Sequence, residues 1–163
     1  MSQLNPYEKF LDGRPLETIL ATTADAIAEY LELLGPRKEK QPAPGKWSAA
    51  EIVCHLADCD LVFGFRLRQT LAENSPTIQP FDQDNWARAI EYSSVPPTLA
   101  LETFTKLREW NLRLIHSALP VAAGRTMTHP ERGTMSFQTL VETMAGHDLN
   151  HLQQLRRIAE TPA

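Results

Sequence analysis

The chain has 163 residues, of which 42% are hydrophobic and 22% are charged. This is enough for one domain with a hydrophobic core, so we expect residues 1–163 to form a single domain, and intrinsic disorder is excluded. A net charge of −4 with scattered basic residues argues against nucleic acid as a partner. No apolar run approaches the roughly 20 residues of a membrane span, and the first residues lack a signal-peptide pattern. We therefore expect a cytoplasmic protein that does not bind membranes.

The periodicity of apolar residues predicts four long helices and no convincing strand. The first helix covers Leu16–Leu34 and ends at Gly35-Pro36, because glycine suits a left-handed cap and proline cannot continue a helix. The second helix follows Ser48 and continues to about Leu71. Ser48 at the N-cap, with Glu51 three residues later, forms the pattern of a capping box.

A long connection separates the second helix from the third. It runs from Ala72 to Pro97, far beyond the about 2–8 residues usual between neighbours in a bundle, and is compatible with a short helix around Asp82–Ile90. The third helix begins near Thr98 and ends at Pro120, and the fourth begins after Ser136. Such a connection lets the second and third helices point the same way. The predicted fold is therefore an all-α four-helix bundle with a crossover, in up-down-down-up order.

The two cysteines, Cys54 and Cys59, are five residues apart on the second helix and point about 140° away from each other. They cannot form a disulfide with each other in that arrangement, which fits a reducing compartment. Cys59 follows His55 by one helical turn, and its expected role is that of a small core residue.

His147 and His151 are four residues apart on the fourth helix, so their side chains share one face with Cβ atoms about 5–6 Å apart. That spacing allows two imidazoles to bind one metal ion. It also occurs in H-E-x-x-H metalloproteases, but here Asp148 replaces the glutamate that serves as general base. No third histidine follows His151, and a metalloprotease is therefore a weak interpretation.

His55, on the inward face of the second helix, is the third candidate ligand. Burying an unsatisfied imidazole costs about 1–3 kcal/mol, and one metal ion would satisfy three such rings together. In the crossover topology the second and fourth helices are antiparallel, which brings His55 to the level of His147 and His151. Parallel helices would separate these levels by roughly 6–12 Å. The sequence therefore predicts a metal site at His55, His147 and His151.

Two blocks of sequence resemble the DinB/YfiT-like superfamily, and the resemblance covers nearly the whole chain. The first block is Trp47-Ser48-x-x-Glu51-Ile52-x-x-His55-Leu56-x-Asp58. The second block comprises His129-Pro130-Glu131-x-Gly133-x-x-Ser136 and, further on, His147-x-x-x-His151-x-x-Gln154.

The resemblance implies a four-helix bundle in the crossover topology with a three-histidine metal site at His55, His147 and His151. It also implies a homodimer, since many members are dimers. The activities it implies are thiol-dependent S-transfer with bacillithiol, mycothiol or glutathione as donor, thiol-dependent isomerisation, and hydrolysis. Many members have no assigned activity, so the resemblance defines the site better than the substrate.

Three further residues are candidates for catalysis. Asp58, one turn after His55, could orient its imidazole or act as a base, and Asp148 could do the same or simply face solvent. His129 could face the metal pocket or serve only as a turn residue before Pro130. Arg66, Arg68 and Trp86 could line the mouth of a site for an anionic or aromatic substrate, although a solvated face or a loop anchor explains them better.

Three neutral imidazoles leave coordination positions open, as catalytic metal sites do, and zinc or nickel suits such a nitrogen-rich set. A water bound there would become acidic, giving metal-dependent hydrolysis with Asp58, Asp148 or His129 as base. A bound low-molecular-weight thiol would be deprotonated, giving S-transfer to a small electrophile. The residues do not separate these two reactions, and the resemblance favours thiol S-transfer. A non-catalytic, metal-stabilised binding module is the third hypothesis.

Overall fold

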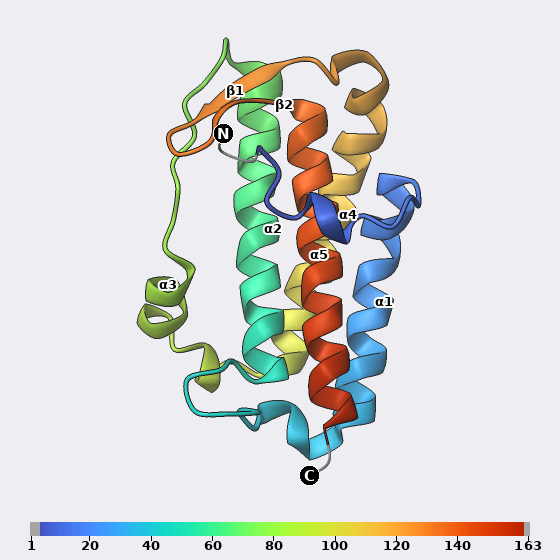
Figure 1. Ribbon diagram of the computed structural model, residues 1–163, viewed down its shortest axis with the longest axis vertical. Helices are drawn as coiled ribbons and strands as arrows, with labels where there is room; N and C mark the ends of the chain where they lie inside the picture. The colour runs from blue at the N-terminus through green and yellow to red at the C-terminus, as the bar shows by residue number, and fades with distance from the viewer. Residues whose placement is uncertain (1–3, 162–163) are drawn as a thin grey trace.

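The computed structural model describes residues 4–161, so the predicted domain boundaries at residues 1 and 163 lie outside the described residues. Four long helices pack side by side in this part of the chain (Figure 1), which confirms the predicted four-helix bundle. The helices are α1 (Leu16–Leu34), α2 (Ala49–Ala72), α4 (Pro97–Ala122) and α5 (Phe137–Glu160).

The crossover between α2 and α4 is present as predicted. The connecting segment descends along the outside of α2 and contains the short helix α3 (Gln83–Ala89), whose N-cap Asp82 accepts a hydrogen bond from the backbone N–H of Asn85 at 2.9 Å. Helices α2 and α4 consequently run in the same direction, and α5 runs antiparallel to α2 (Figure 1). This is the up-down-down-up order, and it places the middle of α2 beside the middle of α5.

Two details of the prediction are wrong. A β-hairpin joins α4 to α5, with β1 (Thr126–His129) antiparallel to β2 (Gly133–Ser136). Strands of four residues are too short to show an alternating pattern in the sequence, although each turns one methionine into the core. Pro120 does not end α4, because a proline in the last turn removes its own N–H bond yet leaves the next two residues free to stay helical.

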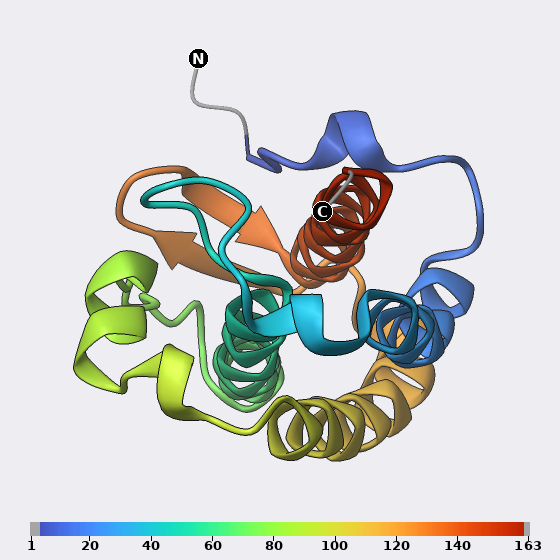
Figure 2. The same cartoon turned by 90° about the horizontal axis from the view of Figure 1, so that it is seen from below.

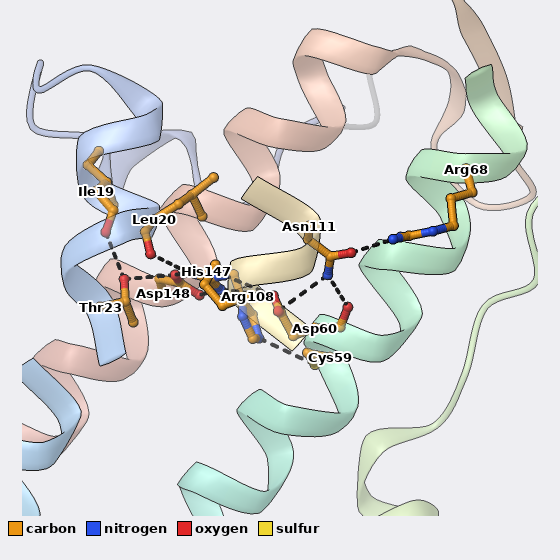
Figure 3. A network of polar contacts seen from close by, with 10 residues as sticks. All are labelled: Ile19, Leu20, Thr23, Cys59, Asp60, Arg68, Arg108, Asn111, His147 and Asp148. Carbon is orange, nitrogen blue, oxygen red and sulfur yellow. Dashed lines mark hydrogen bonds and ion pairs between the residues drawn. The ribbon is translucent and has the colours of Figure 1, made fainter. Parts of the chain in front are cut away.

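The buried interior contains both apolar and charged side chains. The apolar residues form two clusters, one around Phe137 and one around Phe104. Arg108 of α4 is also buried, and it forms ion pairs with Asp60 of α2 at 3.0 Å and with Asp148 of α5 at 2.6 Å (Figure 3). This network ties α2, α4 and α5 together at mid-height.

Among residues 4–161, no helix is both long enough and apolar enough to cross a lipid bilayer.

Candidate metal centre

The three histidines predicted as ligands converge in the middle of the bundle. His147 Nε2 lies 3.1 Å from His55 Nε2 and 3.1 Å from His151 Nε2. All three side chains are buried, and they come from facing positions on the antiparallel helices α2 and α5. The structure therefore brings together the residues that the sequence analysis singled out by their spacing and level.

Cys59 is a candidate ligand that the sequence analysis assigned to the core instead. Its Sγ atom lies 3.5 Å from His55 Nε2 and 3.9 Å from His147 Nε2. The ligand atoms of His55, Cys59 and His147 all lie within 4.8 Å of one another. The signal was present in the sequence, because Cys59 follows His55 at the same four-residue spacing that relates His151 to His147.

The separations between these atoms suit a shared metal ion. Zinc binds nitrogen at about 2.0–2.1 Å and sulfur at about 2.3 Å, so tetrahedral ligands lie roughly 3.3 Å apart for two nitrogens and roughly 3.5 Å for nitrogen and sulfur. Here His147 Nε2 lies 3.1 Å from the Nε2 atoms of His55 and His151, and Cys59 Sγ lies 3.5 Å from His55 Nε2 and 3.9 Å from His147 Nε2. The donor set therefore fits a divalent ion such as zinc or nickel.

Neighbouring side chains orient two of the three rings. Gln154 Oε1 lies 2.9 Å from His151 Nδ1, which places the ring proton on Nδ1 and leaves the Nε2 lone pair facing the other histidines. Trp47 packs against the His55 ring with a centroid separation of 4.9 Å. His147 Nδ1, by contrast, is buried without a hydrogen-bond partner within residues 4–161.

Burial keeps the histidines neutral, which is the form that binds metals. It lowers the pKa of His55 to about 3, with a further contribution from His151, and it lowers the pKa of His151 to about 4. The pKa of His147 lies well below its ordinary value because of burial and the two neighbouring rings. Burial also raises the pKa of the Cys59 thiol, so without a nearby cation the sulfur keeps its proton.

The start of α2 and the buried ion pairs position these side chains. The Ser48 side chain accepts a hydrogen bond from Glu51 N–H at 3.2 Å while Glu51 accepts one from Ser48 N–H at 2.7 Å, which confirms the predicted capping box. Asp60 and Asp148, which hold Arg108, directly follow Cys59 and His147 in the sequence (Figure 3). The ion pairs therefore fix the backbone at both sides of the candidate centre.

The three residues expected to serve as bases are already engaged. Asp148 does not face solvent, as one interpretation of the sequence held, because it is 1% exposed and accepts hydrogen bonds from Arg108 and from Thr23. Asp58 accepts a hydrogen bond from the Tyr92 hydroxyl.

His129 is buried at the end of β1, and its Nδ1 accepts a hydrogen bond from the backbone N–H of Glu131 at 3.2 Å. Its proton therefore lies on Nε2, which makes that nitrogen a donor and not a base.

Two cavities adjoin the histidines. One of about 160 Å³ reaches His147 and Cys59, and the other, of about 590 Å³, opens beside His151. Tyr7 lines both, with its ring edge-on to His147 at a centroid distance of 5.1 Å. The N-terminal segment that carries Tyr7 crosses the outer side of α5, as Figure 1 and Figure 2 show. The candidate centre is thus covered by this segment and accessible from two sides.

Arg66 also lines the smaller cavity. The sequence analysis favoured a solvated position for Arg66, which is wrong because only 9% of the residue is exposed. Trp86 lies outside both cavities, in the segment around α3, where its ring contacts Phe81.

Comparison with protein families matches residues 19–155 to the model of the DinB superfamily. A protein of Oceanobacillus iheyensis that carries the name "putative metal-dependent hydrolase" is 28% identical over 116 residues, which cover 71% of this chain and 67% of that protein. A protein of Bacillus cereus with the same name is 26% identical over 149 residues, covering 89% of this chain and 86% of the relative.

Comparison with solved structures gives a match to YfiT from Bacillus subtilis, described as "a probable metal-dependent hydrolase with an unusual four-helix bundle topology". The TM-score is 0.78 and the sequence identity 19%, with 87% of this chain and 84% of YfiT covered. At this identity the likeness shows the fold, and it confirms the bundle.

Proposed function

Because the chain belongs to the DinB superfamily, we propose that it is a metal-dependent hydrolase of a small-molecule substrate, with His55, His147 and His151 as metal ligands. The observation that carries this proposal is the convergence of three buried Nε2 atoms, of which that of His147 lies 3.1 Å from those of His55 and His151. A zinc or nickel ion held there would make a water molecule acidic enough to attack at neutral pH. The names of the relatives from Oceanobacillus and Bacillus support hydrolysis.

The three residues that the sequence analysis named as bases are all engaged in other contacts. Asp148 and Asp58 hold Arg108 and Tyr92, and His129 carries its proton on the nitrogen that is not engaged by Glu131. We therefore propose that His129 donates a hydrogen bond to the substrate within the cavity that it shares with His147. Tyr7 and Trp47, which pack on the rings of His147 and His55, limit the access of water.

Thiol-dependent S-transfer is a second candidate, and two observations favour it. A thiol loses its proton on a metal ion without help from a protein base, and the three expected bases, Asp58, Asp148 and His129, are engaged elsewhere. The larger cavity beside His151, of about 590 Å³, offers room for a second substrate such as a low-molecular-weight thiol. Because the names of the relatives support hydrolysis, we rank it first, which reverses the order favoured by the sequence analysis.

The test uses the full chain reconstituted with zinc and, separately, with nickel. We expect hydrolysis of small carboxylic esters that depends on the metal and is lost in His55→Ala, whereas His116→Ala, which removes an exposed histidine, retains it. The same preparations are assayed for conjugation of glutathione, bacillithiol and mycothiol to 1-chloro-2,4-dinitrobenzene. Conjugation without ester hydrolysis would favour S-transfer, and neither activity in a metal-loaded protein would favour the non-catalytic binding module.

A homodimer and a cytoplasmic location are further proposals that follow from the sequence analysis. Light scattering coupled to size-exclusion chromatography tests the first, and a dimer is the expected result. Fractionation of the source cells tests the second.

A further inference from the structure

Arg66 is a buried cation beside a cavity. It lies on α2 two helical turns after Cys59, and only 9% of it is exposed. Its Nη2 donates a hydrogen bond to the Gln79 carbonyl at 2.6 Å, and its guanidinium lies 5.9 Å from the centre of the Phe81 ring. Both partners are neutral. No carboxylate within residues 4–161 forms an ion pair with Arg66.

Arg108, another buried arginine of the same chain, has the carboxylate partners that Arg66 lacks. It is 3% exposed and is paired with the carboxylates of Asp60 and Asp148. Buried charges are normally balanced in this way, because a charge removed from water without a counter-ion loses its hydration without compensation. Arg66 is also buried, though less completely than Arg108, and has no such carboxylates, so its position suits an anion that the chain itself does not supply.

The cavity beside Arg66 has a further donor and a positive charge from Arg66 itself. Its lining includes His129, whose Nε2–H is free to donate because Nδ1 accepts the Glu131 N–H. The Arg66 guanidinium carries one positive charge. A carboxylate balances this charge, whereas a phosphate monoester carries between about 1.5 and 2 negative charges.

We propose that Arg66 binds the carboxylate of a small-molecule substrate whose remainder extends through the cavity toward His147 and Cys59. A guanidinium can bind both oxygens of a carboxylate in parallel, which fixes orientation as well as position. The inference rests on the proposed function and names its substrate class: small monocarboxylates with an ester or amide bond beyond the carboxylate. Hydrolysis would add one water across that bond and release an acid together with an alcohol or amine.

The test measures binding of benzoate, of its neutral analogue benzamide, and of inorganic phosphate to the full metal-loaded chain by titration calorimetry. The variants are Arg66→Gln, Arg66→Lys and, as a matched control, Arg68→Gln. Arg68 is a half-buried arginine on the same helix, bound to Gly64 and Asn111 outside the cavity. Metal content and ester hydrolysis are measured on the same preparations.

We expect benzoate to bind the natural chain and Arg68→Gln equally, and to bind Arg66→Gln more weakly by about tenfold or more, with Arg66→Lys in between. Benzamide should bind the natural chain about tenfold more weakly than benzoate. Equal affinity for benzoate and benzamide, undiminished binding to Arg66→Gln, tighter binding of phosphate, or no binding of benzoate would each overturn the proposal.

The proposal stays testable if Arg66→Gln fails to fold, because the comparison of benzoate with benzamide uses the natural chain and Arg66→Lys keeps the charge. The failure of this proposal for Arg66 can also be distinguished from the failure of the proposed metal-dependent hydrolase. A natural chain that holds no metal refutes the metal-dependent hydrolase, whereas the dependence of benzoate binding on Arg66 is decided by the titrations alone.

Discussion

On α2 and on α5, two residues that are adjacent in the sequence belong to two different buried clusters. Cys59 and His147 face the histidine centre, whereas the residues that follow them, Asp60 and Asp148, face Arg108 (Figure 3). Successive residues of a helix point about 100° apart, so the first residue of each pair points toward the histidines and the second points toward Arg108 of α4. A carboxylate that follows a candidate ligand histidine in the sequence therefore need not lie beside the candidate centre.

Cys59 should contribute to metal binding. Its sulfur lies within 4 Å of two histidine nitrogens, and zinc can expand to five ligands, so a fourth protein ligand does not exclude substrate. We expect Cys59→Ser to weaken zinc binding by about tenfold, which corresponds to about 1.4 kcal/mol. In the cobalt-substituted protein, it should remove the near-ultraviolet absorption of a thiolate–cobalt bond.

Cys54→Ser is the matched control, because Cys54 is also buried but its Sγ lies 3.9 Å from the Tyr92 carbonyl and away from the histidines. Absorption that survives in Cys59→Ser, or is lost in Cys54→Ser, would show that Cys59 is not a ligand.

Asp148 should matter for stability and not for proton transfer. Asp148→Asn leaves buried Arg108 with one carboxylate in place of two, and we expect the free energy of unfolding to fall by about 3 kcal/mol. Glu160→Gln removes the exposed Arg156–Glu160 pair and should cost less than about 1 kcal/mol. Denaturant titration measures both, and zinc content should not change in either variant. A fully stable Asp148→Asn protein that has lost hydrolysis would instead support the role of Asp148 as a base.

The N-terminal segment is the element that covers the candidate centre, and its contact with α5 depends on Gly146. A Cβ atom at Gly146 would lie 2.6 Å from the Tyr7 carbonyl oxygen, too close for any relaxed contact. The segment containing Tyr7 and the 3₁₀ helix Glu8–Phe10 can therefore lie against α5 only where the helix has no side chain.

Gly146→Ala should displace this segment. Alanine favours a helix over glycine by about 1 kcal/mol, so a rise in stability would be expected if nothing contacted this position. We expect a fall of about 1–3 kcal/mol instead, together with faster proteolysis near Tyr7, because overpacking forces the backbone to move. Gly124→Ala is the control, since no atom lies within 4 Å of its Cβ position. Equal or greater stability of Gly146→Ala would contradict the tight contact.

The long helices and the short helix α3 were predictable from sequence, and the hairpin was not. The bounds of α1, the capping box at Ser48 and the start of α5 after Ser136 follow from local signals that depend on neighbouring residues. The hairpin and the cover by Tyr7 depend on contacts between distant residues, such as the parallel bridge between Thr77 and Thr128. Periodicity carries no information about such contacts.

At the scale of the whole molecule, the crossover determines which helix faces meet. Because α2 and α5 are antiparallel, histidines separated by 92 residues in sequence come within 3.1 Å of each other. The heights of the histidines along their helices predicted that His55 would lie near His147 and His151, but the sequence did not predict the two cavities. Those depend on the hairpin and on the crossover segment, which supply His129 and Phe81 to the wall of the smaller cavity.

The metal-free protein should lose stability as the pH falls. Burial lowers the pKa of His55 to about 3 and of His151 to about 4, against about 6.5 in the unfolded chain. The unfolded chain therefore binds more protons below pH 6.5, and the free energy of unfolding decreases from there downward. Asp60 acts in the opposite sense, since burial raises its pKa to about 6.

Between pH 7 and pH 5, each buried histidine lowers the free energy of unfolding by about 2 kcal/mol. Protonation of Asp60 offsets roughly the contribution of one histidine. We expect a net loss of about 2 kcal/mol or more between pH 7 and pH 5, measured by denaturant titration in the presence of a chelator. A constant free energy of unfolding over this range would mean that the histidines are not buried as neutral rings.

The most direct test of the metal site is elemental analysis of the untagged full-length protein, with His151→Ala and the exposed-histidine variant His116→Ala beside it. We expect about one zinc or nickel ion per chain in the natural protein and in His116→Ala. His151→Ala should contain little or none. A natural protein that is free of metal and does not take up added zinc or nickel would contradict the proposed metal site, and the three histidines would then be ordinary residues of the core.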